Sequence, residues 1–171
     1  MRTGKPKAPS DPTRLRRAWT GLVIEVFRLN GDLLAAGDTF VGDLGLTSAR
    51  WQVLGAIALS PVPLPVAHIA RNMGLTRQAV QRLVDEMRAD DLVRLEPNPH
   101  HRRAMLVVMT ETGEAAYRAA STRQERWADA LASGLPAESF EAASELLREM
   151  QRRLDEPRLQ TSTSHADTQG A

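Results

Sequence analysis

The chain contains no cysteine, and Phe, Trp and Tyr together make up only 4% of it. The missing cysteine excludes a disulfide framework, a thiolate nucleophile and a cysteine-based redox sensor. No apolar run approaches the roughly 18 residues that span a bilayer, and the basic N-terminus lacks the apolar core of a signal peptide. We therefore expect a cytoplasmic protein that does not enter a membrane.

A strong excess of either charge is also missing, since the formal net charge is +1 over 171 residues. The share of apolar residues, 42%, suits one domain of ordinary size plus an extension. Arginine greatly outnumbers lysine, which suits bidentate phosphate contacts but equally reflects a GC-rich genome. Residues 65–103 nevertheless contain seven arginines against five acids, and local fields matter more than the total.

The sequence shows no catalytic constellation. Its acids are scattered over predicted helix surfaces, and no serine or threonine lies in a nucleophile elbow or a phosphate loop. A zinc site built from His100, His101 and a third ligand is the weaker alternative, because adjacent residues at a hairpin tip point apart. We expect no enzyme activity, no cofactor and no metal.

Residues 65–109 are the most informative segment. Pro65 suits a first helical position, and Val66, Ile69, Ala70 and Met73 then form one apolar stripe, which predicts a short helix. Gly74 supplies a left-handed residue that ends this helix, and the Thr76 hydroxyl can cap the next one. Two helices joined by so tight a turn indicate a helix-turn-helix.

The second helix, residues 76–90, has an apolar stripe with long polar side chains on its other face. Glutamine there can form two hydrogen bonds to the edge of an adenine, and arginine can do the same with guanine. Arginines occupy its first half and acids its second, against the preference of the helix dipole, and an anion near the N-terminal half would explain that order. The alternative is a face that is simply solvated.

Residues 92–109 read as a β-hairpin, with aliphatic flanks around a tip that carries two histidines and two arginines. Such a tip can contact a phosphate backbone or enter a minor groove. The predicted DNA contacts are Thr76, Arg77, Gln78, Gln81, Arg82, His100, His101, Arg102 and Arg103.

Both ends of the chain predict amphipathic helices, at residues 12–36 and 137–155. They carry more apolar surface than one small domain needs, so we expect a homodimer, with a monomer that folds both helices onto itself as the alternative. The predicted interface residues are Leu15, Trp19, Leu22, Val23, Val26, Phe140, Leu147, Met150 and Leu154.

Residues 12–155 resemble the MarR family of bacterial winged-helix regulators (multiple antibiotic resistance regulators). The resemblance rests on ordered segments that are each weak alone: Gly45-Leu46-Thr47 with Trp51-Gln52-Val53-Leu54, Gly74-Leu75-Thr76-Arg77-Gln78-Ala79-Val80, Leu92-Val93, and Asn98-Pro99 through Arg102-Arg103 followed by Thr110-Glu111-Thr112-Gly113. It implies a mainly helical fold with a small β-hairpin wing, in which N- and C-terminal helices join two subunits.

The resemblance further implies a repressor that binds double-stranded DNA and is released by a small, often aromatic, effector. Phe27, Phe40 and Trp51 are candidate walls of the effector site, with Arg50 as a candidate carboxylate anchor, although each is more often plain core or surface. These four residues are the predicted effector site.

Two positions depart from the family pattern. Asp91 stands where members commonly carry glycine, and aspartate tolerates the left-handed conformation. His100 and His101 stand where an aspartate usually pairs with a wing arginine, so Arg102 loses its expected partner. Histidines that titrate near neutral pH predict a DNA affinity that depends on pH.

We thus divide the chain into a disordered basic tail (1–11), helical dimerisation regions (12–36 and 112–155), a winged helix-turn-helix DNA-binding domain (46–110) and a disordered tail (157–171). The predicted function is a bacterial, sequence-specific, dimeric transcription regulator acting on a pseudo-palindromic operator. The alternative is a winged-helix protein-interaction module without DNA binding, which the near-neutral charge and the altered wing favour slightly.

Overall fold

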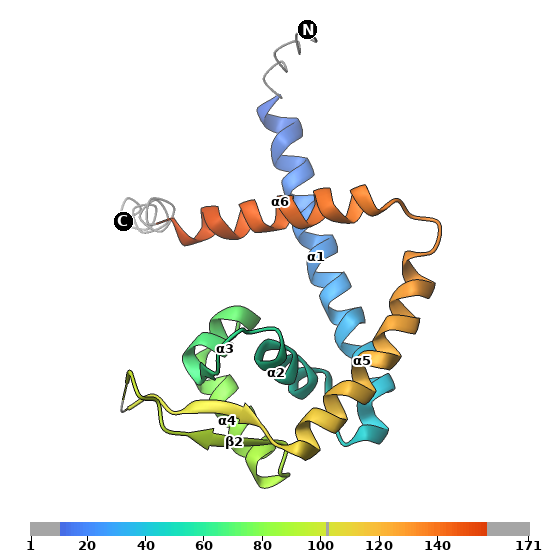
Figure 1. Ribbon diagram of the computed structural model, residues 1–171. Helices are drawn as coiled ribbons and strands as arrows, with labels where there is room; N and C mark the ends of the chain where they lie inside the picture. The colour runs from blue at the N-terminus through green and yellow to red at the C-terminus, as the bar shows by residue number, and fades with distance from the viewer. Residues whose placement is uncertain (1–10, 102, 157–171) are drawn as a thin grey trace, which may run out of the picture. The chain divides into compact units, whose positions relative to one another are not determined.

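The computed structural model describes residues 11–101 and 103–156, so Arg102 and both predicted tails except Asp11 lie outside it. The elements in chain order are α1 (Pro12–Val41), the 3-10 helix η1 (Gly42–Leu44), α2 (Ser48–Ala58), β1 (Leu64–Pro65), α3 (Val66–Met73), α4 (Arg77–Ala89), β2 (Val93–Glu96), β3 (Leu106–Met109), α5 (Glu111–Ala132) and α6 (Ala137–Asp155) (Figure 1). This arrangement confirms the predicted fold class of helices with a small β-wing. The chain divides into two compact units at Glu125, within α5.

The helix-turn-helix forms as its sequence predicts. Gly74 ends α3 in the left-handed region with φ of 65°, which a residue without a side chain adopts at little cost. The Thr76 hydroxyl accepts a hydrogen bond from the Ala79 N–H at 3.2 Å and so caps α4. Pro65 is not the first helical residue as expected, because its ψ of 156° is extended and it lies in β1 as the N-cap of α3.

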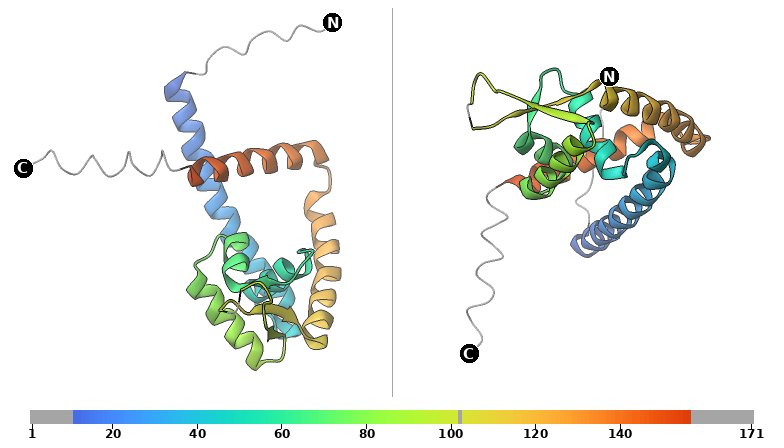
Figure 2. Two further views of the ribbon diagram at one scale, coloured as in Figure 1. Left: turned by 60° about the vertical axis from the view of Figure 1, so that its left-hand side comes forward. Right: turned by 90° about the horizontal axis from the view of Figure 1, so that it is seen from below.

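The sheet has three antiparallel strands in the order β1-β3-β2. Val107 of β3 lies opposite Leu64 of β1 on one side and Leu95 of β2 on the other. Strands β2 and β3 are the predicted wing, and their hairpin projects from the helices of this unit (Figure 2). Strand β1 was not predicted, because a two-residue strand has no periodic pattern and forms only by pairing with β3.

The core of the first unit fixes the back of α4. Val80, Val84 and Met87, one face of this helix, are fully buried. They pack in one cluster with side chains from the end of α1, from α2, from α3 and from β3. Burying three such side chains contributes roughly 5 kcal/mol or more, so α4 presents its opposite face to solvent in one orientation.

The start of α5 is held tightly against the turn that follows α4. Asp91 adopts the left-handed conformation predicted for it, with φ of 55°, and Thr110 N–H donates to the Leu92 carbonyl at 3.2 Å. A Cβ at Gly113 would lie only 2.0 Å from the same carbonyl oxygen, so this glycine is required by close packing. Farther along α5, Arg123 binds Asp43 of η1 at 2.8 Å, and this hydrogen bond lowers the pKa of the Asp43 carboxyl.

Helix α1 continues beyond residue 36 to Val41, and its N-cap is Asp11, which we had placed in the tail. A Cβ at Gly37 would lie 2.6 Å from Ser48 Oγ, so a small residue lets α1 approach α2. Large apolar side chains along α1 are exposed, including Leu15 and Trp19.

Helix α6, in the second unit, has no buried residue of its own, and Phe140, Leu147 and Leu154 are exposed. Within the part of the chain that the structure describes, no helix combines the length and apolarity needed to cross a membrane.

Candidate nucleic-acid interface

The solvent-facing side of α4 gathers long polar side chains. Arg77, Gln78 and Arg82 are exposed, and Gln81 is half-buried beside them. Together with Asp85 they line one shallow concave surface of about 510 Å³. The structure therefore brings together the predicted contacts of this helix, with Thr76 capping its start.

A hydrogen bond orients Gln81 on this surface. Its Nε2 donates to Asp85 Oδ1 at 3.1 Å, and the Gln81 carbonyl oxygen and second amide N–H remain available for a partner. An acceptor beside a donor matches the N6 amino group and N7 of adenine in the major groove. Asp85 thus orients Gln81, a role that sequence reasoning missed.

A larger groove of about 860 Å³ separates α4 from the wing. Its lining includes Arg77 and Gln81 from α4, and His100, His101 and Arg103 from the wing. His68 of α3 also lines the groove and was not among the predicted contacts. No aspartate or glutamate lines it in the part of the chain described, so its charged lining is basic and suits a phosphate backbone.

The wing tip is shaped without the aspartate that the family resemblance implies. The Asn98 side chain accepts from the His100 N–H at 2.9 Å, and the Ala104 N–H donates to the His101 carbonyl, also at 2.9 Å. An asparagine that caps its own turn in this way is a common local device. Asn98 therefore fills part of the shaping role, whereas the predicted contact Arg102 lies outside the described residues.

The structure does not bring the four candidate effector residues together at one site. Phe40 and Trp51 meet edge to face at 5.3 Å, while Phe27 is 72% exposed on α1. Trp51 lines a cavity of about 620 Å³ between α2, α3 and α5, where Met73 and Tyr117 are further walls. Phe27, Phe40 and Arg50 do not line this cavity.

One polar atom of Trp51 lacks a partner within the described chain. The indole Nε1 of Trp51 is buried and makes no hydrogen bond within the described chain. Such an orphan donor is uncommon and costs free energy unless something else accepts from it. The guanidinium of Arg50, by contrast, is bound to Asp90 and Glu86.

Comparison with known proteins decides the family. Residues 44–104 match the family model described as MarR family. The chain is 35% identical over 129 residues to an uncharacterized protein of Mycobacterium tuberculosis, a match that covers 75% of this chain and 89% of the relative. It is 32% identical over 94 residues to the transcriptional activatory protein BadR of Rhodopseudomonas palustris, over 54% of each chain. This chain belongs to the MarR family.

Solved structures agree with the MarR fold. The Mycobacterium tuberculosis regulator MOSR, in complex with DNA, superposes with a TM-score of 0.66 at 21% identity, covering 78% of this chain and 98% of that one. CouR of Rhodococcus jostii, bound to p-coumaroyl-CoA, gives a TM-score of 0.66 at 22% identity, with coverages of 75% and 90%. At such identities the likeness establishes a shared fold.

As a MarR family member, the protein is a DNA-binding transcription regulator and not an enzyme. The described residues contain no group of three or more His, Cys, Asp or Glu that could hold a metal ion.

Proposed function

We propose that this protein is a homodimeric repressor that binds a pseudo-palindromic operator in a sequence-specific way. The observation that carries the proposal is the exposed Arg/Gln face of α4 beside a groove whose charged lining is basic. Two such faces about 34 Å apart would enter successive major grooves, with the wings over the flanking minor grooves. A protein bound in this way would block RNA polymerase from the promoter.

The dimer part of the proposal is supported by exposed apolar side chains on the two terminal helices. Trp19 is 46% exposed and Phe140 46% exposed in the single chain. Symmetric pairing is the commonest way to cover such faces. The proposed interface comprises Leu15, Trp19, Leu22, Val23, Val26, Phe140, Leu147, Met150 and Leu154.

A gel-shift titration with DNA from upstream of the protein's own gene tests sequence-specific binding. We expect binding that exceeds that to a random duplex by at least about a thousandfold and weakens steeply between two salt concentrations. Equal binding to both duplexes would contradict an operator, and no binding would favour the protein-interaction alternative. Transcription in vitro from the same fragment should fall when the protein is added; an increase would make it an activator.

We further propose that the cavity lined by Trp51 holds a small aromatic effector. The partly apolar lining, in which Met73 and Tyr117 lie with Trp51, supports this class of ligand. An effector releases DNA only if it binds the DNA-incompetent state more tightly than the competent one. A thermal-shift series with p-coumarate and related aromatic acids should raise the melting temperature, and Trp51→Phe should reduce that shift.

A further inference from the structure

An arginine from α2, Arg50, forms ion pairs with Glu86 and Asp90 at the C-terminal end of α4. We call this group of three residues the clasp. Arg50 Nη1 lies 2.7 Å from Asp90 Oδ2, and Arg50 Nη2 lies 3.6 Å from Glu86 Oε2. The Arg50 side chain is only 18% exposed, whereas the two carboxylates are about half exposed. A charge-assisted contact made by a largely buried arginine is stronger and better defined than an ordinary surface pair.

This clasp explains the unusual order of charge along α4. Acids near the C-terminus of a helix oppose its dipole, yet Glu86 and Asp90 lie in the last turn and at the C-cap of α4. The guanidinium of Arg50 compensates both of them from a neighbouring helix. The acids in the C-terminal half of α4 are therefore compensated within the protein, and no bound anion is needed to explain them.

The same end of α4 is also tied to α5. Thr112 Oγ1 lies 3.3 Å from Asp91 Oδ2, and the Thr110 N–H donates to the Leu92 carbonyl at 3.2 Å. Residues 90–92 thus form a junction at which α2 and α5 hold the end of α4 that lies farthest from Arg77.

Geometry makes this junction important for reading bases. From Arg77 to Asp90 the helix is roughly 20 Å long, so a tilt of about 10° at the junction moves the first turn by about 3 Å. A bidentate contact to a base edge tolerates far less than that displacement.

We propose that Arg50 is a positioning residue, which holds α4 in its DNA-reading orientation through Asp90 and Glu86 without touching DNA. This inference rests on the proposed sequence-specific binding. It assigns to Arg50 a role other than the carboxylate anchor expected from the sequence.

The variant Asp90→Asn separates positioning from charge, because it weakens the clasp while making the protein more positive. Charge alone predicts tighter DNA binding, whereas loss of positioning predicts weaker binding to the operator. We expect Asp90→Asn and Arg50→Gln each to lower operator affinity about tenfold. The double variant should lose little more operator affinity than either single variant, because both substitutions remove the same ion pair. Affinity for a random duplex should fall less than tenfold.

Matched controls come from the pair Arg118 and Glu114 on α5, which is exposed and 3.6 Å apart. Arg118→Gln and Glu114→Gln change the net charge as Arg50→Gln and Asp90→Asn do, and they should leave operator discrimination unchanged. Circular dichroism verifies that each variant is folded. If Arg50→Gln does not fold, Arg50→Lys takes its place, and its operator affinity should lie between that of the wild type and one tenth of it.

Operator binding by Asp90→Asn as tight as that of the wild type, or tighter, would overturn the positioning role alone. A wild-type protein that cannot distinguish the operator from a random duplex would overturn the proposed function, and the positioning role with it.

Discussion

Side chains on the proposed DNA-binding surface differ in the partners that they can bind. Arg82 forms no ion pair within the described chain and lines the concave face of α4. Arg103 lines the wing groove, where histidines are its neighbours. Arginine on a recognition helix is placed to read guanine, whereas arginine on a wing is placed to bind phosphate.

Replacing these two arginines should therefore have different effects. Arg82→Ala should relax preference at one base pair of each half-site by about 1–3 kcal/mol, because a bidentate base contact is lost. Arg103→Ala should weaken all sequences alike and reduce the salt slope by about 1, as expected for one phosphate contact. Affinity measured over single-base operator variants at several salt concentrations would show both effects. Uniform losses for both variants would contradict the assigned roles.

The wing histidines give a second prediction for single residues. His100 and His101 share their groove with His68, Arg77 and Arg103, and no described acid lines it. Imidazole N–H groups in a groove with this lining can donate to phosphate oxygens. The replacement of both His100 and His101 by alanine should therefore lower operator affinity at a fixed pH, measured by fluorescence anisotropy. Equal affinity of wild type and variant would contradict this role.

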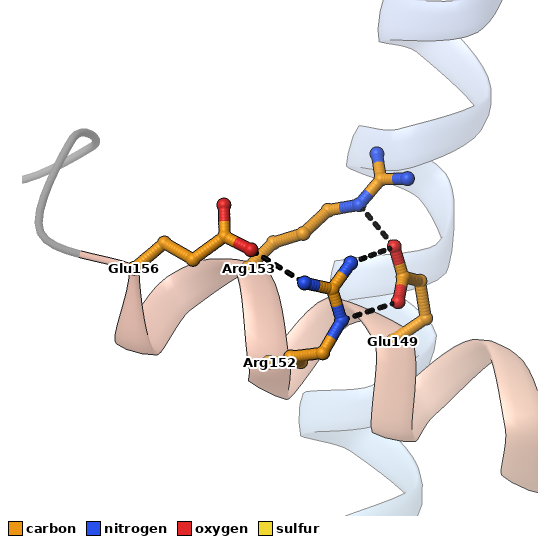
Figure 3. A network of polar contacts seen from close by, with 4 residues as sticks. All are labelled: Glu149, Arg152, Arg153 and Glu156. Atoms are coloured by element: carbon orange, nitrogen blue, oxygen red, sulfur yellow. Dashed lines mark hydrogen bonds and ion pairs between the residues drawn. The ribbon is translucent and has the colours of Figure 1, made fainter.

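Among the elements, α6 carries a network of ion pairs over about its last two turns (Figure 3). Glu149 accepts from Arg152 at 2.8 Å and from Arg153 at 2.6 Å, and Arg152 also binds Glu156. The hydrogen bonds from Arg152 and Arg153 lower the pKa of Glu149 from its ordinary value of 4.5 to about 2. The network thus favours helix at the end of α6 while Glu149 is charged.

The pH dependence of this network follows from the sign of that shift. A depressed pKa in the folded state means that the stabilisation is present above pH 4.5 and is lost as the pH falls toward 2. Wild type should therefore be more helical than Glu149→Gln at pH 7, and the two should converge near pH 2. Circular dichroism across this range, with Glu145→Gln as a control, measures the difference. High salt should reduce it, because the network is exposed.

For the whole molecule, the exposed apolar faces of α1 and α6 are the main unsatisfied feature. Leu15 and Leu154, for example, are 58% and 59% exposed in a single chain. Scattered apolar side chains are normal on a surface, but runs of them along two helices are what the proposed dimer interface would cover.

A charge placed on one of these faces should separate the subunits. Leu147→Glu should shift the protein toward monomer and lower operator affinity by about a hundredfold or more, because two linked half-site contacts become independent. Analytical ultracentrifugation and the gel shift measure the two effects. Val62→Glu, on the exposed loop between α2 and β1, introduces the same charge away from the proposed interface and serves as the control. A Leu147→Glu protein that stays dimeric would place the interface elsewhere.

The sequence by itself determined the parts of this protein that depend on near neighbours. The apolar stripes of α3 and α4, the left-handed Gly74 and the Thr76 cap all follow from residues a few positions apart. Helix periodicity and capping are local interactions, so they can be read without knowing the rest of the fold.

Only the tertiary structure decided the features that join distant segments. β1 exists because it pairs with β3, and His68 reaches the wing groove because α3 packs beside it. Arg50 meets Asp90 across 40 residues of sequence, and the N–H of Trp51 is buried without a hydrogen-bond partner in the described chain, which no sequence pattern indicates. These arrangements depend on how helices and strands pack, which side-chain periodicity alone does not specify.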